Sequence, residues 1–240
     1  MTNPRLPRLE ARLQAAKELA GDFRSFGDIG ADHGILSAIL LSENPERRAI
    51  VADISEAALQ KAVHRLTRHG LEKQCLFRVA DGLKALQGEK VDVVFILGMG
   101  GDTIARILEE GKDALQGAAL IVSGHTETEL LRKAVYRIGY HLTEEKVVWE
   151  QDRSYLLLKA LPGEEPLPEE RSLYLGPLLE QERSPEWLRL MEKQSRFLGS
   201  AIRCMEQNER DAGRLALFQT RLAWVGECLS GKDQEKEENL

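Results

Sequence analysis

The stretch Phe-Gly-Asp-Ile-Gly-Ala-Asp-His-Gly-Ile-Leu, residues 26–36, decides the fold that this sequence predicts. A short apolar segment leads into Asp28, glycines follow at positions 30 and 34, and an apolar run with helical spacing begins at Ile35. Open α/β sheets use such a strand, tight glycine turn and helix to form a nucleotide-type pocket at the carboxyl end of the strand. Gly30 suits the turn, because without a side chain it turns freely and lets a ligand approach the backbone.

An acid, rather than a first glycine, leads this turn. A carboxylate such as Asp28 favours the cationic aminoacyl end of S-adenosylmethionine (SAM), whereas a pyrophosphate needs bare N–H groups without a neighbouring negative charge. The Gly-x-Gly-x-x-Gly pattern expected of a nicotinamide dehydrogenase does not occur here. We therefore predict that Asp28, Gly30 and His33 belong to a SAM site. The alternative for Asp28 is a plain turn with a capping aspartate.

The segments that follow alternate between strand-like and helical patterns as far as residue 160. Strands are expected at 26–29, 49–52, 76–79, 91–97 and 118–122, with helices at 6–19, 35–40, 55–68, 103–110 and 127–137. This alternation predicts an α/β fold with a mostly parallel sheet covered on both faces. Residues 141–149 and 155–159 then form two strands without an intervening helix, which favours a Rossmann-like, methyltransferase-type sheet.

Acidic residues also end the second and third predicted strands. Asp53, followed by Ile54, stands where a carboxylate accepts hydrogen bonds from ribose hydroxyls. Asp81, followed by Gly82, stands where a carboxylate can accept from the adenine amino group. Taken singly, Asp53 could cap a helix together with Ser55, and Asp-Gly is a common turn. Turns alone would rarely place three acids at three successive strand ends, so we assign these residues to the cofactor.

The fourth predicted strand runs into Gly98-Met99-Gly100-Gly101. Backbone with so little side chain suits a flat ring held close to a methyl donor. We expect Gly98 to contact the cofactor, and Met99, Gly100 and Gly101 to contact the substrate. A flexible loop before a helix is the alternative.

Asp32 projects an acid from the first loop, where SAM-binding loops tend to have glycine. It could bind an acceptor amine or accept its proton, or it could cap the helix that begins near Gly34. Asp32 and His33 are adjacent and lack the spacing of a metal pair, so no metal is predicted. His125, at the end of the fifth strand, is left out of the catalytic set because a lone loop histidine is usually solvated.

Composition sets the remaining bounds. The chain has 240 residues, 42% of them hydrophobic and 30% charged, and a net charge of -6. This charge argues against coating nucleic acid by bulk attraction and leaves room for a local basic face. No apolar run approaches the roughly 20 residues that span a bilayer, and the first residues show no secretion segment. Three widely separated cysteines fit a reducing cytoplasm.

The expected domains are a SAM-binding domain over 1–160, a proline-rich linker over 161–184, a helical hairpin over 185–230 and a frayed tail over 231–240. Heptad-like apolar steps on both sides of Asn208 predict the hairpin. Its arginines and lysines either contact phosphates or form a solvated coiled-coil face, since glutamates lie among them.

Three motifs together resemble one family. Asp-Ile-Gly-Ala-Asp-His-Gly (28–34), Asp-Gly-Leu (81–83) and Gly-Met-Gly-Gly (98–101) are similar to those of bacterial tRNA adenine N1-methyltransferases that modify position 22, the TrmK type. Leu-Gly-Pro-Leu-Leu (175–179), ahead of the two-helix tail, resembles that family too. The resemblance implies a class I SAM-dependent methyltransferase that acts on tRNA as a cytoplasmic enzyme. It also implies that Asp32 is the catalytic aspartate and that the helical tail helps to hold tRNA. A monomer is favoured.

The chain departs from the family pattern at four places. The family often has an aromatic residue at Ile35, proline at Ser37, glutamate at Asp53, and Gln-Pro-Asn where residues 122–124 read Val-Ser-Gly. The changes at 35 and 122–124 bear on the acceptor more than on the cofactor. A methyltransferase with a small-molecule or protein acceptor, and a non-catalytic SAM-binding RNA module, are therefore the alternative functions.

Overall fold

The structure is a computed structural model that describes residues 6, 8–207 and 211–237, with side chains described as far as Ser230. The chain divides into two compact units, residues 1–167 and residues 168–240.

A seven-stranded sheet forms the centre of the first unit, among the residues that the structure describes. Its strands are β1 (Ser25–Ile29), β2 (Arg48–Asp53), β3 (Cys75–Val79), β4 (Val93–Met99), β5 (Ala119–Gly124), β6 (Tyr140–Glu150) and β7 (Arg153–Pro162). They lie in the order β3-β2-β1-β4-β5-β7-β6. Strands β1 to β5 are parallel, and β7 runs antiparallel to both β5 and β6. The predicted methyltransferase-type sheet, closed by an antiparallel pair, is therefore confirmed.

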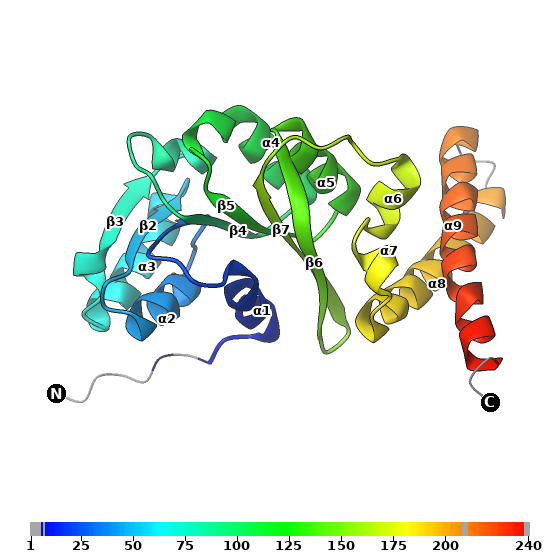
Figure 1. Ribbon diagram of the computed structural model, residues 1–240, viewed down its shortest axis with the longest axis horizontal. Coiled ribbons are helices and arrows are strands. Elements are labelled where there is room, and N and C mark those ends of the chain that lie inside the picture. The colour runs from blue at the N-terminus through cyan, green and yellow to red at the C-terminus, as the bar shows by residue number, and fades with distance from the viewer. Residues whose placement is uncertain (1–5, 7, 208–210, 238–240) are drawn as a thin grey trace. The chain divides into compact units, whose positions relative to one another are not determined.

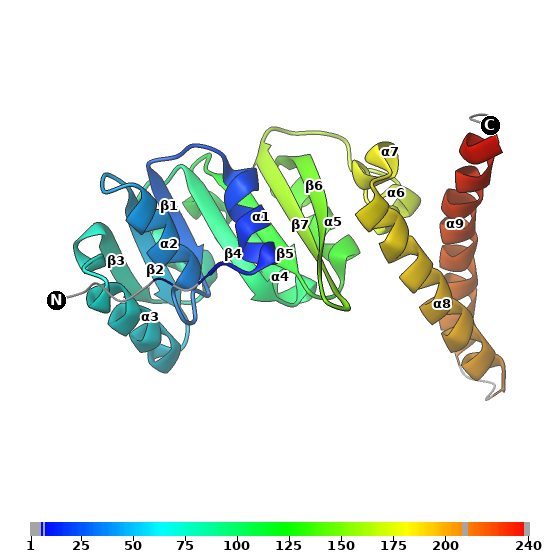
Figure 2. The same ribbon diagram turned by 90° about the horizontal axis from the view of Figure 1, so that it is seen from below.

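Helices cover both faces of this sheet (Figure 1). One face carries α1 (Ala11–Ala20), α2 (Ile35–Glu43) and α3 (Glu56–Arg68), and the other carries α4 (Gly101–Gly111) and α5 (Thr128–Arg137). Short 3₁₀ turns lie at η1 (Glu72–Gln74), η2 (Gly82–Leu86) and η3 (Lys112–Ala114). The view in Figure 2 shows α1 crossing the sheet on the same side as α2. Strand β4 is buried on both faces, which explains its nearly continuous apolar sequence.

Three aromatic rings anchor the core beneath α1 and α2. Phe23, Phe26 and Phe95 meet edge to face with ring centroids 5.7 to 6.0 Å apart, a geometry that the ring quadrupole favours. The predicted cap of α3 is also confirmed, because the Ser55 hydroxyl accepts a hydrogen bond from the Ala58 amide at 3.3 Å.

The first helix differs from its prediction over residues 6–19. Helix α1 begins at Ala11, after Glu10, so Leu6 lies before the helix. Leu6 nevertheless packs against the core. We extended the helical spacing of Leu9, Leu13, Ala16 and Leu19 too far towards the N-terminus.

The second unit begins within the segment that we predicted as a linker, and the structure differs there. Strand β7 continues to Pro162, and two short helices follow, α6 (Glu170–Leu175) and α7 (Leu179–Glu182). The leucines at 173, 175 and 179 are buried. We gave the prolines of residues 162–168 more weight than these leucines, which fold the segment into the unit.

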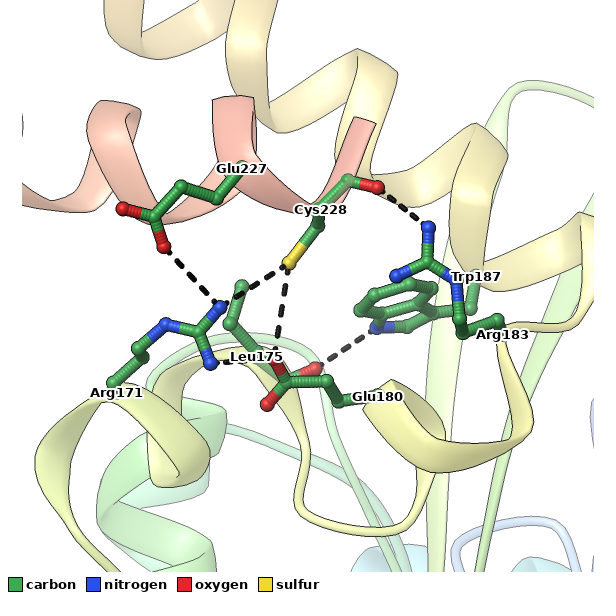
Figure 3. A network of polar contacts seen from close by, with 7 residues as sticks. All are labelled: Arg171, Leu175, Glu180, Arg183, Trp187, Glu227 and Cys228. Atoms are coloured by element: carbon green, nitrogen blue, oxygen red, sulfur yellow. Dashed lines mark hydrogen bonds and ion pairs between the residues drawn. The ribbon is translucent and has the colours of Figure 1, made fainter. Parts of the chain in front are cut away.

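A polar network joins these short helices to Glu227 and Cys228 in the last helix of the chain (Figure 3). Arg171 forms an ion pair with Glu180 at 2.5 Å and another with Glu227 at 3.5 Å. The Arg183 guanidinium donates to the carbonyl of Cys228 at 2.7 Å. Burial, and then the neighbouring Glu180 carboxylate, raise the pKa of the Cys228 thiol, so the thiol remains protonated at neutral pH.

Two long helices, α8 (Pro185–Gln207) and α9 (Ala212–Glu237), complete the second unit and pack against each other. Trp187, Met191, Leu198 and Ile202 are buried on α8, as their spacing predicted. The turn near Asn208 lies outside the described residues. The backbone of residues 231–237 continues α9, which differs from the frayed tail that we expected over 231–240; residues 238–240 lie outside the described residues.

Candidate active site

A cavity of about 460 Å³ opens at the carboxyl ends of the parallel strands. Strands β1 and β4 are neighbours, and the chain proceeds outwards from them in opposite directions, through β2 to β3 and through β5. This is the topological switch point at which open α/β sheets bind ligands. The cavity is lined by Arg12, Leu13, Asp28, Ile29, Gly30, Ala31, Asp32, His33, Ile35, Leu36, Asp53, Ile54, Ala80, Asp81, Gly82, Leu97, Gly98, Met99, Thr103, Arg106, Ile107 and His125.

Asp28 lies near the carboxyl end of β1, and only 7% of its surface is exposed. Its carboxylate accepts a hydrogen bond from the Ser37 hydroxyl at 2.5 Å. Burial raises the pKa of Asp28 to about 6, hydrogen bonds from the Ser37 hydroxyl and amide oppose the rise, and the charge of Asp53 adds to it. Asp28 thus bonds to the first turn of α2, as the capping alternative suggested, and also faces the cavity. The resembling family often has proline at position 37, which could not donate these bonds.

Asp53 and Asp81 occupy the ends of β2 and β3, and both line the cavity. One Asp53 oxygen accepts from the Ser55 amide at 2.8 Å, and the other accepts from the Asp32 amide at 3.3 Å. Asp81 lies 3.5 Å from the Lys84 ammonium and 3.8 Å from the Arg106 guanidinium. A carboxylate has about four acceptor positions, so both residues retain capacity for a ligand. Ile54 stands beside them with 68% of its surface exposed.

Asp32 lies in the cavity wall with its side chain 57% exposed. Its carboxylate is 3.6 Å from the Lys61 ammonium and 3.5 Å from His33 Nε2. The N-cap of α2 is Gly34, and no side chain caps this end of the helix. The capping alternative for Asp32 is therefore wrong, and its side chain remains at the surface of the cavity.

The glycine-rich segment after β4 contributes to the cavity only in part. Gly98 and Met99 line it, whereas Gly100 and Gly101 are not among the lining residues. A Cβ atom on Gly101 would lie 2.3 Å from the backbone oxygen of Thr126. This glycine therefore allows α4 to begin tightly against the loop after β5, and nothing in the cavity supports its predicted contact with the substrate.

Several lining residues were missed by the sequence reasoning. His125, which we left out of the catalytic set, lines the cavity, and so do Thr103, Arg106 and Ile107 from α4. Arg12 comes from α1, which we expected only to cover the sheet. The amphipathic pattern of α4 could have indicated which of its residues face the cavity. No local pattern could have indicated that Arg12 lies at the carboxyl ends of the strands.

Two further properties of the described residues bear on the kind of site. Among the described residues, no cluster of three or more histidine, cysteine or acidic side chains could hold a metal ion. In the same part of the chain, every helix is too short or too polar to cross a membrane.

The fold and the cavity together define a class of enzyme. The cavity volume lies within the usual 300–1,000 Å³ or so of ligand pockets, and carboxylates from the ends of three neighbouring strands line it. The class is the Rossmann-like class I SAM-dependent methyltransferase. Comparison with known proteins identifies the family within this class. The family model described as tRNA (adenine(22)-N(1))-methyltransferase, TrmK, matches residues 26–225, and the chain belongs to this family of SAM-dependent tRNA-methylating enzymes.

Individual relatives agree with the family match. The tRNA (adenine(22)-N(1))-methyltransferase of Bacillus subtilis is 29% identical over 188 residues, which cover 76% of this chain and 79% of that protein. The crystal structure of B. subtilis TrmK is similar with a TM-score of 0.84 at 27% identity, covering 94% of this chain and all of that one. Streptococcus pneumoniae Sp1610, in complex with S-adenosyl-L-methionine, has a TM-score of 0.80 at 28% identity, covering 92% and 100%.

Proposed function

We propose that the cavity of the first unit is where this chain methylates N1 of an adenine in tRNA, at position 22, and that Asp32 acts on the target base. The observation that best supports this is the set of carboxylates at the ends of β1, β2 and β3 around one cavity. When bound, SAM would supply an electrophilic methyl group on its sulfonium. The lone pair of N1 would form the new C–N bond as the C–S bond breaks, and the thioether product of SAM would be the leaving group. The cavity residues bind and align the two partners, and alignment is the larger part of the catalysis.

Each end of the cofactor has a suitable group in the cavity. Asp28 would receive the ammonium of the aminoacyl end, Asp53 the ribose hydroxyls, and Asp81 the adenine amino group. Ile54, an apolar side chain left largely exposed, would pack on the adenine ring. Folded proteins gain from covering such a side chain, so its exposure at the edge of a polar cavity supports a ligand there.

Asp32 would accept a hydrogen bond from the exocyclic amino group of the target adenine. Such a bond raises electron density at N1 and stabilises the positive charge that the base acquires during transfer. Adenine N1 is hidden in a paired helix, so the base must be unpaired or flipped out to reach the cavity. The surface exposure of Asp32 agrees with a partner that arrives from solution.

The backbone of Asp32 gives independent support. Its φ is +41°, in the left-handed region that costs a residue other than glycine roughly 1 kcal/mol or more. Glycine would fit this position without strain, and the sequence nevertheless places an acid there. Strained residues of this kind cluster at active sites, where the side chain is needed for function.

The strain makes Asp32→Gly a sharp test, because the variant removes the carboxylate without harming the fold. We expect Asp32→Gly and Asp32→Asn to retain the calorimetric affinity for S-adenosylhomocysteine (SAH) within about twofold. Transfer of labelled methyl from SAM to unmodified tRNA should fall by roughly 100-fold or more. Asp113→Asn, at an exposed aspartate of η3, is the matched control and should retain both.

The outcomes separate the possible roles. Equal loss of SAH binding and methyl transfer would mean that Asp32 supports the cofactor and not the base. Full activity in Asp32→Gly would reject the proposed role outright. A 1-methyladenosine signal in the nucleosides of the wild-type product, mapped to position 22, tests the acceptor itself.

We also propose that the helical unit helps to hold tRNA and that the enzyme acts as a cytoplasmic monomer. Exposed basic side chains on α8 and α9 support the RNA contact; they are Arg189, Lys193, Arg196, Arg203 and Arg214. Replacing Lys193 and Arg196 together by glutamate should weaken tRNA binding and reduce its salt dependence, with SAH affinity unchanged. Unchanged tRNA affinity would favour the alternative of a solvated helix face.

A further inference from the structure

Arg12, on α1, lines the cavity, and two nitrogens of its guanidinium have no hydrogen-bond partner in the described part of the chain. Its backbone amide donates to Glu150 at 2.8 Å, which fixes the start of α1 against β6. Its guanidinium carbon lies 5.2 Å from the centroid of the Tyr155 ring on β7, within cation–π range. Nε and Nη1 are both buried, and neither has a hydrogen-bond partner among the described residues.

Such an arrangement is suited to binding a ligand. A guanidinium carries five N–H donors in a planar fork and stays charged at any ordinary pH. Leaving its buried donors unpaired is costly, and native proteins rarely do so. The stacking on Tyr155 holds the fork in place without satisfying those in-plane donors. The geometry is that of a preformed anion-binding group, because carboxylates and phosphates match the fork in a bidentate manner.

Gly98 locates this group within the cavity. This residue has a φ of +84°, and a Cβ atom placed on it would lie 3.1 Å from Arg12 Nη1. The absence of a side chain therefore lets the guanidinium reach over the end of β4. Strand β4 pairs with β1, which carries Asp28. Arg12 therefore lies at the end of the cavity that we assign to the aminoacyl group. Asp81 lies farther away, beyond β2 at the end of β3.

The charges around the cavity select the ligand. The α-carboxylate is the one full anion of SAM, and the neighbouring side chains of Asp28, Asp32 and Asp53 would repel it. The other arginine in the cavity wall is engaged, because Arg106 lies 3.1 Å from Glu110 and 3.8 Å from Asp81. Arg12 is therefore the group suited to that anion.

We propose that Arg12 binds the α-carboxylate of the methionine part of SAM and thereby selects the intact cofactor. This inference rests on the proposed placement of the aminoacyl end at Asp28. A tRNA phosphate is the competing ligand for the same fork, and the experiment below distinguishes the two.

The test compares SAH with its decarboxylated analogue, S-adenosyl-3-thiopropylamine, which keeps the amine and lacks only the carboxylate. Calorimetry of the wild-type chain should show a preference for SAH of roughly 30-fold, the range of a hydrogen-bonded charge pair. Arg12→Met should weaken SAH by about that factor and change the affinity for the analogue less than about twofold. Arg12→Lys, which keeps the charge without the fork, should retain part of the preference.

Arg24→Met is the matched control, because Arg24 is exposed and precedes β1 at the opposite edge of the sheet; it should leave both affinities unchanged. Equal weakening of both ligands by Arg12→Met would mean a merely structural role and overturn the proposal. Unchanged SAH affinity with weaker tRNA binding would assign the fork to a phosphate and also overturn it. A wild-type chain that binds neither ligand would instead contradict the proposed function. If Arg12→Met does not fold, the Arg12→Lys comparison decides the same question.

Discussion

The buried carboxyl of Asp28 should make the enzyme less stable at neutral pH than at mildly acidic pH. Folding raises the pKa of this group from 3.8 to about 6, so the folded state binds the proton more tightly than the unfolded state does. Stability is then greatest below the unfolded pKa and declines as pH rises from about 4 to 6, where the carboxyl must ionise inside the protein. A rise of about two units corresponds to about 3 kcal/mol.

Asp28→Asn removes the ionisation and keeps a carbonyl that can accept the hydrogen bonds from Ser37. We expect the variant to exceed the wild type in unfolding free energy by up to about 3 kcal/mol at pH 7.5 and by only about 1 kcal/mol at pH 4.5. Urea unfolding followed by circular dichroism at the two pH values measures this difference, and titration of the other groups cancels between the two proteins. Asp22→Asn, at an exposed aspartate, is the control and should show no pH-dependent difference.

The same substitution should weaken SAH binding, because an amide cannot neutralise the ammonium of the aminoacyl end. A variant that is more stable and binds less well is the expected signature of an acid kept for function. A stability difference that is equal at pH 4.5 and 7.5, or that favours the wild type at pH 7.5, would refute the reasoning about Asp28.

Three further results are expected. Gly101→Ala should destabilise the first unit by roughly 2 kcal/mol or more in urea unfolding, because the added methyl meets the Thr126 carbonyl oxygen at 2.3 Å; an effect below half of that would contradict the packing role. Asp53→Ala should weaken SAH by roughly 10-fold or more in calorimetry, as two hydrogen bonds are lost, and unchanged affinity would reject the ribose assignment. Trp187→Phe should cost roughly 1–3 kcal/mol of stability, because the buried indole donates to the Leu175 carbonyl at 2.9 Å. If Trp187→Phe is neutral, the hydrogen bond does not support α6.

Local sequence patterns were sufficient to predict most strands and helices of the first unit. The apolar runs ending at Asp28 and Asp53, each followed by turn and helix signals, predicted strands and helices to within a few residues. The spacing of apolar residues and the residues that cap a helix are local features, so a short window of sequence is enough to recognise them. The resemblance in the loops after β1 and β4 led to the family, and the family match confirms it.

The prediction went wrong where distant segments decide the structure. Residues 161–184 read as a linker because of their prolines, yet α6 and α7 form around Leu173 and Leu175, which are buried. The packing of Gly101 against Thr126 was not foreseen either, and the contact of Gly100 and Gly101 with the substrate stays a prediction. In each case the partner lies far along the chain, so no local pattern could reveal it.

The sequence by itself determined the class of sheet, the positions of the acids at its strand ends and the family, because these follow from local periodicity and short motifs. Only the tertiary structure decided which side chains face one another across the cavity. It raised the pKa of Asp28 through burial, gave Asp32 its left-handed backbone, and brought Arg12 from the first helix to the end of β4 beside Gly98. Burial, strain and an unpaired charge all depend on contacts between distant segments, and those contacts exist only after the chain has folded.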